Sequence, residues 1–244
     1  MLWDSEELRS FSIAASDGEI GSVDDLLFDD ESWRIRWLVL STGGWINERQ
    51  VLLPPHSLGK PDLAAHTIPV GLTREQIRNS PELDSDAPLS RQVERQIYDY
   101  YGWKAYWTSS SVPPLATGVP DVDPSPPSVR DLEIPGQPIL RSLKEVKGYY
   151  IRASNGDIGH VDGFLIEDLE AVRYLVIDTK NWWPGKKVLI SARWVQDVSW
   201  TRQQISIAPT REQVEQSPEY DGTGPVERAY EERLHRHYGY DPYW

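Results

Sequence analysis

The chain has 244 residues, with 38 acidic and 25 basic side chains and a net charge of −13. Nonspecific binding of nucleic acid or anionic lipid needs clustered Lys and Arg, so we expect no nucleic-acid partner and no measurable affinity for RNA or anionic vesicles at physiological salt. The absence of cysteine excludes disulfides, thiolate metal sites and cysteine nucleophiles.

Targeting and membrane segments are not expected from the sequence. The first residues, "MLWDSEELRS", lack the basic start and apolar run of a signal peptide. No apolar stretch approaches the roughly 20 residues of a membrane helix. We therefore expect a cytoplasmic protein without an integral membrane segment.

The sequence contains an internal repeat. "SDGEIG" at residues 16–21 returns as "SNGDIG" at 154–159, and "RWLVLST" at 36–42 returns as "RYLVIDT" at 173–179. From Arg36 onward the two copies stay in register, 137 positions apart, and both end on Tyr-Trp. The chain is therefore a tandem duplication.

The duplication predicts two domains and a linker. The first repeat spans residues 1–107 and the second spans 139–244. Residues 108–138, rich in Pro, Ser and acidic side chains, form the linker. We expect each repeat to contain its own core and limited proteolysis to cut first in the linker.

Each repeat begins with short segments of strand character separated by turns. The "DG" and "NG" pairs are typical of hairpins. No crossover helix separates the segments, which favours antiparallel pairing, and closure into a small barrel would remove exposed sheet edges. We predict a mainly β fold of two small antiparallel barrels in tandem.

A helical extension follows each barrel. Thr73-x-x-Gln76 and Thr210-x-x-Gln213 are capping boxes that open a short helix. A second helix is expected with Pro88 in its first turn in one copy and Pro225 in the other, and it is expected to end at the glycines in "YYGW" and "HYGY".

The two repeats resemble the PRC-barrel family. The resemblance lies in "ASDGEIGSVDDLLFDD" with "RWLVLSTGGWINERQVLLP", and in "ASNGDIGHVDGFLIED" with "RYLVIDTKNWWPGKKVLIS". It covers residues 8–72 and 140–209. The extensions look like those of stand-alone bacterial PRC-barrel proteins.

The resemblance implies an assembly role. In this family the barrel forms the cytoplasmic domain of the H subunit of purple-bacterial photosynthetic reaction centres. It also forms the C-terminal domain of the ribosome-maturation factor RimM. Both use it as an interaction module, and no catalytic residue of the family maps onto this chain.

Polar side chains give no convincing metal or catalytic motif. The acidic turn Asp24, Asp25, Asp29, Asp30 and Glu31 could bind a divalent cation, but a solvated turn is favoured, and the second copy offers only Asp162, Glu167, Asp168 and Glu170. His235 and His237 are two apart on a helix, which indicates surface or helix-end positions rather than a metal pair.

Aromatic residues are the candidate interaction or packing sites. Trp45, Trp182 and Trp183 fall in predicted hairpin loops, where they cap a barrel, pack between barrels or anchor a partner. Trp107 and Trp244 close the two copies and are interpreted as latches. Replacing either with alanine is expected to lower the unfolding midpoint of its own repeat.

Three functions remain open. The first is a non-enzymatic interaction scaffold with an unknown protein partner, barrel–barrel contact within the chain and a possible homodimer. The second is an accessory protein of a photosynthetic or electron-transport assembly, implied by the family resemblance. The third is a small-molecule-binding or enzymatic protein with a site in the inter-barrel cleft. We expect no enzymatic activity, no cofactor and no metal.

Overall fold

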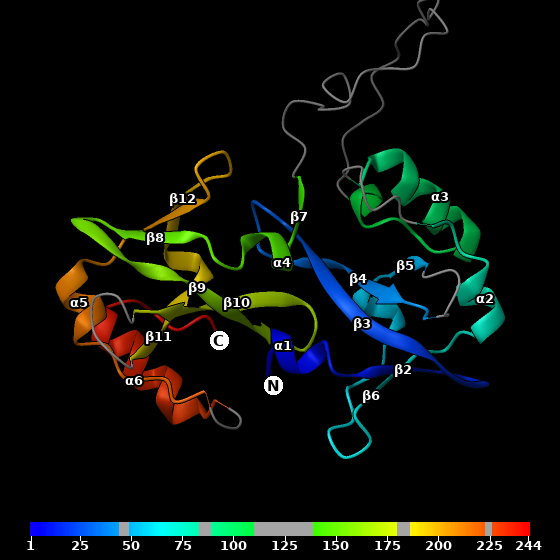
Figure 1. Ribbon diagram of the computed structural model, residues 1–244, viewed down its shortest axis with the longest axis horizontal. Coiled ribbons are helices and arrows are strands. Elements are labelled where there is room, and N and C mark those ends of the chain that lie inside the picture. The colour runs from blue at the N-terminus through cyan, green and yellow to red at the C-terminus, as the bar shows by residue number, and fades with distance from the viewer. Residues whose placement is uncertain (44–48, 83–88, 110–138, 180–185, 223–225) are drawn as a thin grey trace, which may run out of the picture.

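The computed structural model describes residues 1–43, 49–82, 89–109, 139–179, 186–222 and 226–244. It contains two separate β-sheets with helices around them (Figure 1). The first sheet has the order β5-β4-β3-β2-β6. Its strands are β2 (Ser12–Ala15), β3 (Gly18–Asp29), β4 (Ile35–Ser41), β5 (Gln50–Leu53) and β6 (Thr67–Pro69).

The second sheet repeats this arrangement with one added strand. Its order is β11-β10-β9-β8-β13-β12, in which β12 has no counterpart among the named strands of the first sheet. Its strands are β8 (Tyr150–Ala153), β9 (Gly156–Glu167), β10 (Ala171–Asp178), β11 (Lys187–Ser191), β12 (Val195–Ser199) and β13 (Gln204–Ile207). The mainly β fold in two sheets is confirmed.

The second glycine of each "GxIG" turn is required by a close backbone approach. A Cβ atom at Gly21 would lie 2.1 Å from the Ser41 carbonyl oxygen, and one at Gly159 would lie 2.1 Å from that of Asp178. Both glycines also have positive φ, 154° and 150°. Glycine therefore permits the backbone of β3 to approach that of β4, and β9 to approach β10, this closely.

One pair in each sheet is parallel. β6 pairs with β2, and β13 pairs with β8, in parallel. The remaining pairs of named strands are antiparallel, as the sequence predicts. The chain passes through η1 (Pro55–Ser57) before β6, so it returns to β2 in the same direction.

The two repeats exchange their first strands. β1 (Leu2–Asp4) pairs with β9 of the second sheet, and β7 (Leu140–Ser142) pairs with β3 of the first sheet. The registers are equivalent: Leu2 lies opposite Glu167, and Leu140 lies opposite Asp29. Each repeat thus supplies an edge strand to the sheet of the other, and β7 runs beside β3 in Figure 1.

A second reciprocal contact joins the turns before β4 and β10. The Ile35 amide donates to the Glu170 carbonyl (2.8 Å), and the Val172 amide donates to the Trp33 carbonyl (2.9 Å). Arg34 and Ala171 form the antiparallel bridge between these two bonds. The repeats are therefore related by an approximate twofold axis through this bridge.

The hydrophobic core is continuous across the repeats. One cluster of buried residues contains Leu8, Phe28 and Trp33 together with Ile166 and Leu169. A second, smaller cluster of buried residues belongs to the first repeat alone: Trp37, Val39, Leu52, Ile97 and Tyr98. The expectation that each repeat contains its own core stays a prediction, while the larger cluster shows that the cores of the two repeats are in contact. The boundaries of the two repeats at residues 107 and 139 stay a prediction from the sequence.

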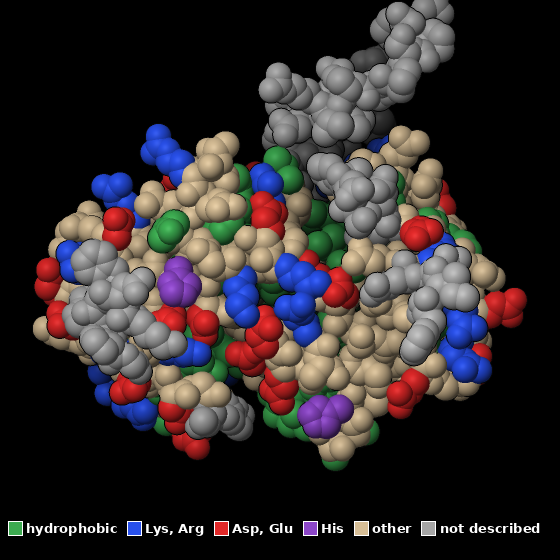
Figure 2. All heavy atoms as spheres, viewed as in Figure 1, with side chains coloured by type: hydrophobic (Ala, Val, Ile, Leu, Met, Phe, Trp, Pro, Cys, Tyr) green, Lys and Arg blue, Asp and Glu red, His purple; other side chains and the backbone are tan. Residues whose placement is uncertain are grey.

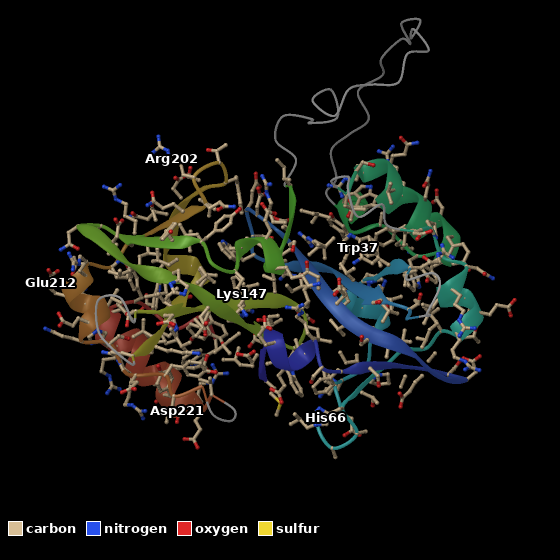
Figure 3. All side chains as sticks on the ribbon, viewed as in Figure 1. Trp37, His66, Lys147, Arg202, Glu212 and Asp221 are labelled. Carbon is tan, nitrogen blue, oxygen red and sulfur yellow. The ribbon has the colours of Figure 1, made fainter. Side chains whose placement is uncertain are left out.

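Short helices follow the exchanged strands. α1 (Ser5–Leu8) follows β1, α4 (Leu143–Val146) follows β7, and both lie between the two halves of the molecule in Figure 1. Figure 2 shows acidic and basic side chains interleaved at the centre of this face. Lys147, labelled in Figure 3, pairs with Glu6 across the repeats (3.1 Å).

The extensions are helical, as predicted. α2 (Arg74–Arg78) and α5 (Arg211–Glu215) begin at the expected capping boxes. α3 (Arg91–Tyr101) and α6 (Arg228–Tyr238) end on left-handed glycines at φ 69° and 71°. Pro88 and Pro225, expected in the first turns of these helices, lie outside the described residues, and the helices begin at Arg91 and Arg228.

Within the described part of the chain, no helix combines the length and the apolar character needed to cross a membrane.

Candidate functional site

A buried glutamate anchors α3 to the first sheet. Glu94 is 2% exposed and accepts hydrogen bonds on Oε1 from Trp37 Nε1 (2.8 Å) and the Tyr106 hydroxyl (3.1 Å). Its Oε2 pairs with Arg91 (2.8 Å). We call these four residues the first latch. Trp37 lies on β4, facing the helix (Figure 3).

The second repeat contains an equivalent second latch, made of Glu231, Tyr174, Arg228 and Tyr243. Glu231, 3% exposed, accepts from the Tyr174 hydroxyl (3.0 Å) and the Tyr243 hydroxyl (2.8 Å). Its other oxygen pairs with Arg228 (3.0 Å). Every member lies 137 positions after its counterpart.

Two arginines enclose the tyrosine of each latch. The Arg36 guanidinium lies 4.3 Å from the Tyr106 ring centroid and that of Arg91 lies 5.3 Å away. In the second latch Arg173 and Arg228 lie 4.6 and 5.7 Å from Tyr243. Such cation–π contacts hold the residues after α3 and α6 against the sheets.

The latch carboxylates are structural. Burial raises the pKa of Glu94, and the hydrogen bond from Trp37 opposes that rise. A buried carboxylate is tolerated when hydrogen bonds and an opposite charge compensate its lost hydration. Since both oxygens of Glu94 are occupied by protein donors, we assign it a packing role and not one in acid–base chemistry.

His235 extends the second latch. Its Nε2 lies 3.0 Å from the Tyr174 hydroxyl and its Nδ1 lies 3.1 Å from the Asp241 carbonyl oxygen. The expected helix-end position is confirmed, since His235 lies in the last turn of α6. A surface position is excluded, because the ring is 1% exposed and stands where the first repeat has Tyr98 against the sheet. Burial lowers the pKa of His235, so the ring is neutral at pH 7.

The lowered pKa of His235 predicts acid sensitivity of the free energy of unfolding. The unfolded state takes up a proton near pH 6.5, before the folded state does, so this stability is present above pH 6.5 and is lost as pH falls towards the folded pKa. One such proton gives a slope of at most about 1.4 kcal/mol per pH unit.

Urea titrations at pH 7.5 and 5.5 of the wild type and of His235→Gln measure this contribution. We expect the wild type to lose about 1 kcal/mol more than the variant over this range. The pKa of His56 is lowered in the same direction by burial, but both proteins retain His56, so the comparison cancels it. Equal losses of unfolding free energy in the two proteins would contradict a lowered pKa of His235.

Trp107 and Trp244, the last residues of the two repeats, are not members of the latches. Trp107 is half-buried against the Tyr98 ring (5.2 Å) and Arg91 (4.4 Å). Trp244 is 48% exposed and lies over Arg228 (4.0 Å). The adjacent tyrosines, rather than the tryptophans, are thus the anchored members. Trp45, Trp182 and Trp183 lie outside the described residues.

Tyr243→Ala is therefore expected to lower the free energy of unfolding more than Trp244→Ala. Loss of the ring and of its hydrogen bond to Glu231 is expected to cost about 2–3 kcal/mol. Loss of the exposed Trp244 is expected to cost less than about 1 kcal/mol. Urea denaturation measures both, and a larger loss for Trp244→Ala would contradict the latch.

The carboxylates of the acidic turn, all in the described part of the chain, do not gather into a group that could hold a metal ion. Asp25 and Asp29 are buried on β3, so the expected solvated turn is wrong for both residues. Asp29 accepts from the Ser32 amide (3.0 Å) and pairs with Arg36 (2.8 Å). Asp25 accepts from the Ser142 hydroxyl of the exchanged strand. The side chains are thus directed to separate partners.

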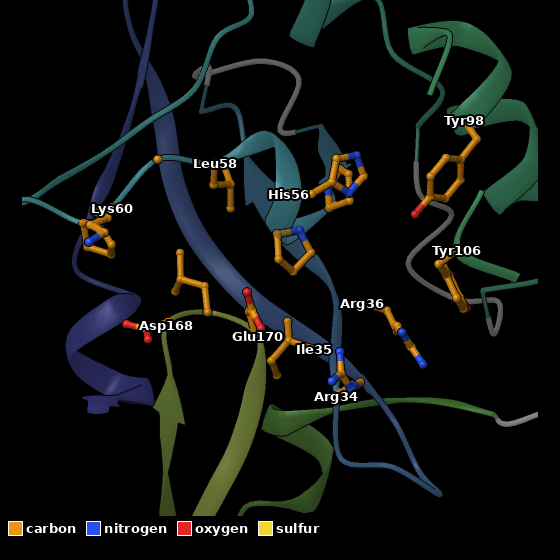
Figure 4. A pocket seen from close by; sticks show the side chains of 15 residues that line it. Arg34, Ile35, Arg36, His56, Leu58, Lys60, Tyr98, Tyr106, Asp168 and Glu170 are labelled. Atoms are coloured by element: carbon orange, nitrogen blue, oxygen red, sulfur yellow. The ribbon is translucent and has the colours of Figure 1, made fainter. Parts of the chain in front are cut away.

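A cleft of about 600 Å³ lies at the junction of the repeats (Figure 4). We call it the first cleft. One wall comes from the start of β4, from α3 and from the segment after β5, and the opposite wall is the turn between β9 and β10. Its lining side chains include Arg34, Arg36, Pro54, Pro55, His56, Leu58, Lys60, Pro61, Tyr98, Tyr106, Asp168 and Glu170.

The approximate twofold axis relates this cleft to a second one of about 330 Å³. Leu58 and Lys60 of the first cleft correspond to Val195 and Asp197 of the second cleft, 137 positions later. The second cleft is lined by acidic side chains, Asp30, Glu31 and Asp197, and by aromatic ones, Trp33 and Trp200. The two clefts have thus diverged in charge.

The sequence did not point to the latches or to the basic residues of the first cleft, although the acidic residues Asp30, Glu31, Asp168 and Glu170 of the two clefts were among the candidates. A signal for the latches was present, because Arg91, Glu94 and Tyr106 all recur at the same spacing in the second copy. The clefts had no comparable signal, because they form where segments of different repeats meet.

Comparison with known proteins agrees with this fold. Residues 5–75 match the PRC-barrel domain family, so this part of the first repeat is a PRC-barrel domain. An uncharacterized protein of Deinococcus radiodurans is 30% identical over 99 residues. The aligned stretch covers 37% of this chain and 35% of that bacterial protein, about a third of each.

Proposed function

We propose that the protein is a non-enzymatic interaction scaffold in which two PRC-type barrels, one in each repeat, act as one body. The equivalent strand order of the second sheet supports extending the barrel assignment to the second repeat. The exchanged strands β1 and β7 and the continuous core support a single rigid body. The acidic, cysteine-free composition is compatible with the cytoplasm.

The observation that carries this proposal is the pair of junctional clefts with different charge. Open clefts with charged rims and apolar walls suit the recognition of a protein segment. The latch carboxylates support the absence of catalysis, since protein donors occupy both oxygens of each.

Affinity capture from cells that make the protein tests this function. The tagged full chain, cross-linked before lysis, is expected to enrich one or a few proteins in near-stoichiometric amounts over a tag-only control. Recovery of the chain alone, at expression levels that saturate the resin, would contradict a scaffold role.

A small-molecule-binding role is the second candidate. The first cleft has the size of small-ligand sites, which occupy about 300–1,000 Å³. A rise in melting temperature with dicarboxylates, together with no captured protein, would favour this candidate. The electron-transport alternative rests on the family resemblance alone.

A further inference from the structure

We propose that the first cleft binds an extended acidic peptide segment of the protein partner. This inference rests on the proposed scaffold function and names the chemistry of the segment. Carboxylates of the segment pair with Arg34 and Lys60, while apolar side chains between them pack on the proline wall.

Arg34 and Lys60 are the available cations of the first cleft. Both are exposed, and neither forms an ion pair within the described part of the chain. Arg36, by contrast, pairs with Asp29 (2.8 Å) and lies over Tyr106. Arg34 and Lys60 therefore break no ion pair of the described protein when they bind a ligand. They also make the edge of the first cleft attractive to negative charge, although the whole chain is acidic.

The positions of the two cations favour an extended ligand. In Figure 4 Lys60 and Arg34 lie at opposite sides of the cleft, with Glu170 between them. Glu170 forms no ion pair among the described residues, so it repels a carboxylate placed midway. A chain with separated acidic residues fits this alternation better than one compact anion.

The wall between the cations is apolar and rigid. Pro54, Pro55 and Leu58 line it, and Tyr106 lies beyond Arg36 at one side of the cleft (Figure 4). The prolines have no amide hydrogen to donate and fixed φ angles, so this wall offers contact area at a small entropic cost. Aromatic-lined grooves of this kind accept extended, proline-containing peptides.

The second cleft provides an internal comparison. Ala171 stands in place of Arg34, and Asp197 stands in place of Lys60. Asp30 and Glu31 add further negative charge there. An acidic segment is thus directed to the first cleft, and the double variant Arg34→Ala/Lys60→Asp gives the first cleft the residues of the second.

Fluorescence anisotropy with a labelled peptide of alternating Glu and Pro tests the inference. Peptides with Gln or Lys in place of Glu carry the same label. The matched control variant is Arg152→Ala/Arg202→Asp, which alters two exposed arginines of the second repeat and the net charge by the same amount. Melting curves establish that all variants fold.

We expect the Glu peptide alone to bind the wild type, with an affinity that falls as salt rises. The cleft variant is expected to bind at least tenfold more weakly, and the matched control to bind within twofold of the wild type. Equal losses in both variants, equal binding of the Gln peptide, or no binding of the Glu peptide at 1 mM would overturn the inference.

Repeating the affinity capture with the cleft variant separates this inference from the scaffold function. If the wild type and the variant enrich the same proteins equally, the scaffold function stands and the acidic-segment inference falls. If neither enriches a protein while the peptide series behaves as expected, the cleft chemistry stands and the scaffold function falls.

Discussion

Replacing Glu94 or Glu231 by alanine is expected to lower the free energy of unfolding by about 3–5 kcal/mol. In the first repeat the change removes the acceptor of Trp37 and Tyr106 and leaves the Arg91 guanidinium without its counter-ion. Buried donors without an acceptor are costly. Against a total stability of about 5–15 kcal/mol, this loss is easily measured by urea denaturation.

Glu232→Ala is the matched control for Glu231→Ala. Glu232 is the next residue on α6 but is exposed, so its removal is expected to change the free energy of unfolding by less than about 0.5 kcal/mol. Similar losses for Glu231→Ala and Glu232→Ala would show that the buried carboxylate does not hold the helix to the sheet.

Trp3→Ala is expected to lower the free energy of unfolding of the whole chain by about 3–5 kcal/mol. Trp3 is 5% exposed on β1, opposite Ile166 of the second sheet, and its ring contacts Phe11 of the first repeat (5.9 Å). Its removal therefore weakens both halves. We expect one cooperative transition, shifted to lower denaturant, by both tryptophan fluorescence and circular dichroism.

Arg141→Ala provides the comparison at the equivalent position of β7. The Arg141 side chain is 22% exposed and lies over Trp200 (4.2 Å), so its loss is expected to cost about 1 kcal/mol. Two separate transitions in Trp3→Ala, or a larger loss for Arg141→Ala, would contradict a shared core.

Much of the local structure could be predicted from the sequence because it depends on nearby residues. The capping boxes at Thr73 and Thr210 and the glycines that end α3 and α6 act within a few residues. The repeat itself is visible as sequence identity. The PRC-barrel resemblance of the first copy agrees with the family match at residues 5–75.

The strand exchange could not be predicted from local patterns. β1 and β7 have three residues each, and either could pair with β9 or β3, since these are equivalent strands of the two sheets. The choice depends on contacts between distant residues. The burial of His235 could not be predicted for the same reason. It depends on contacts with Tyr174 and Trp194, which are distant in the sequence.

Cleaving the linker of the folded protein tests the central claim most directly. A site-specific protease sequence placed between residues 110 and 138 allows one cut, followed by size-exclusion chromatography with light scattering. Because β1 and β7 are exchanged and the core is shared, we predict that both fragments elute together at the mass of the uncut chain until denaturant is added. Elution as two folded species, each near half that mass, would contradict the account.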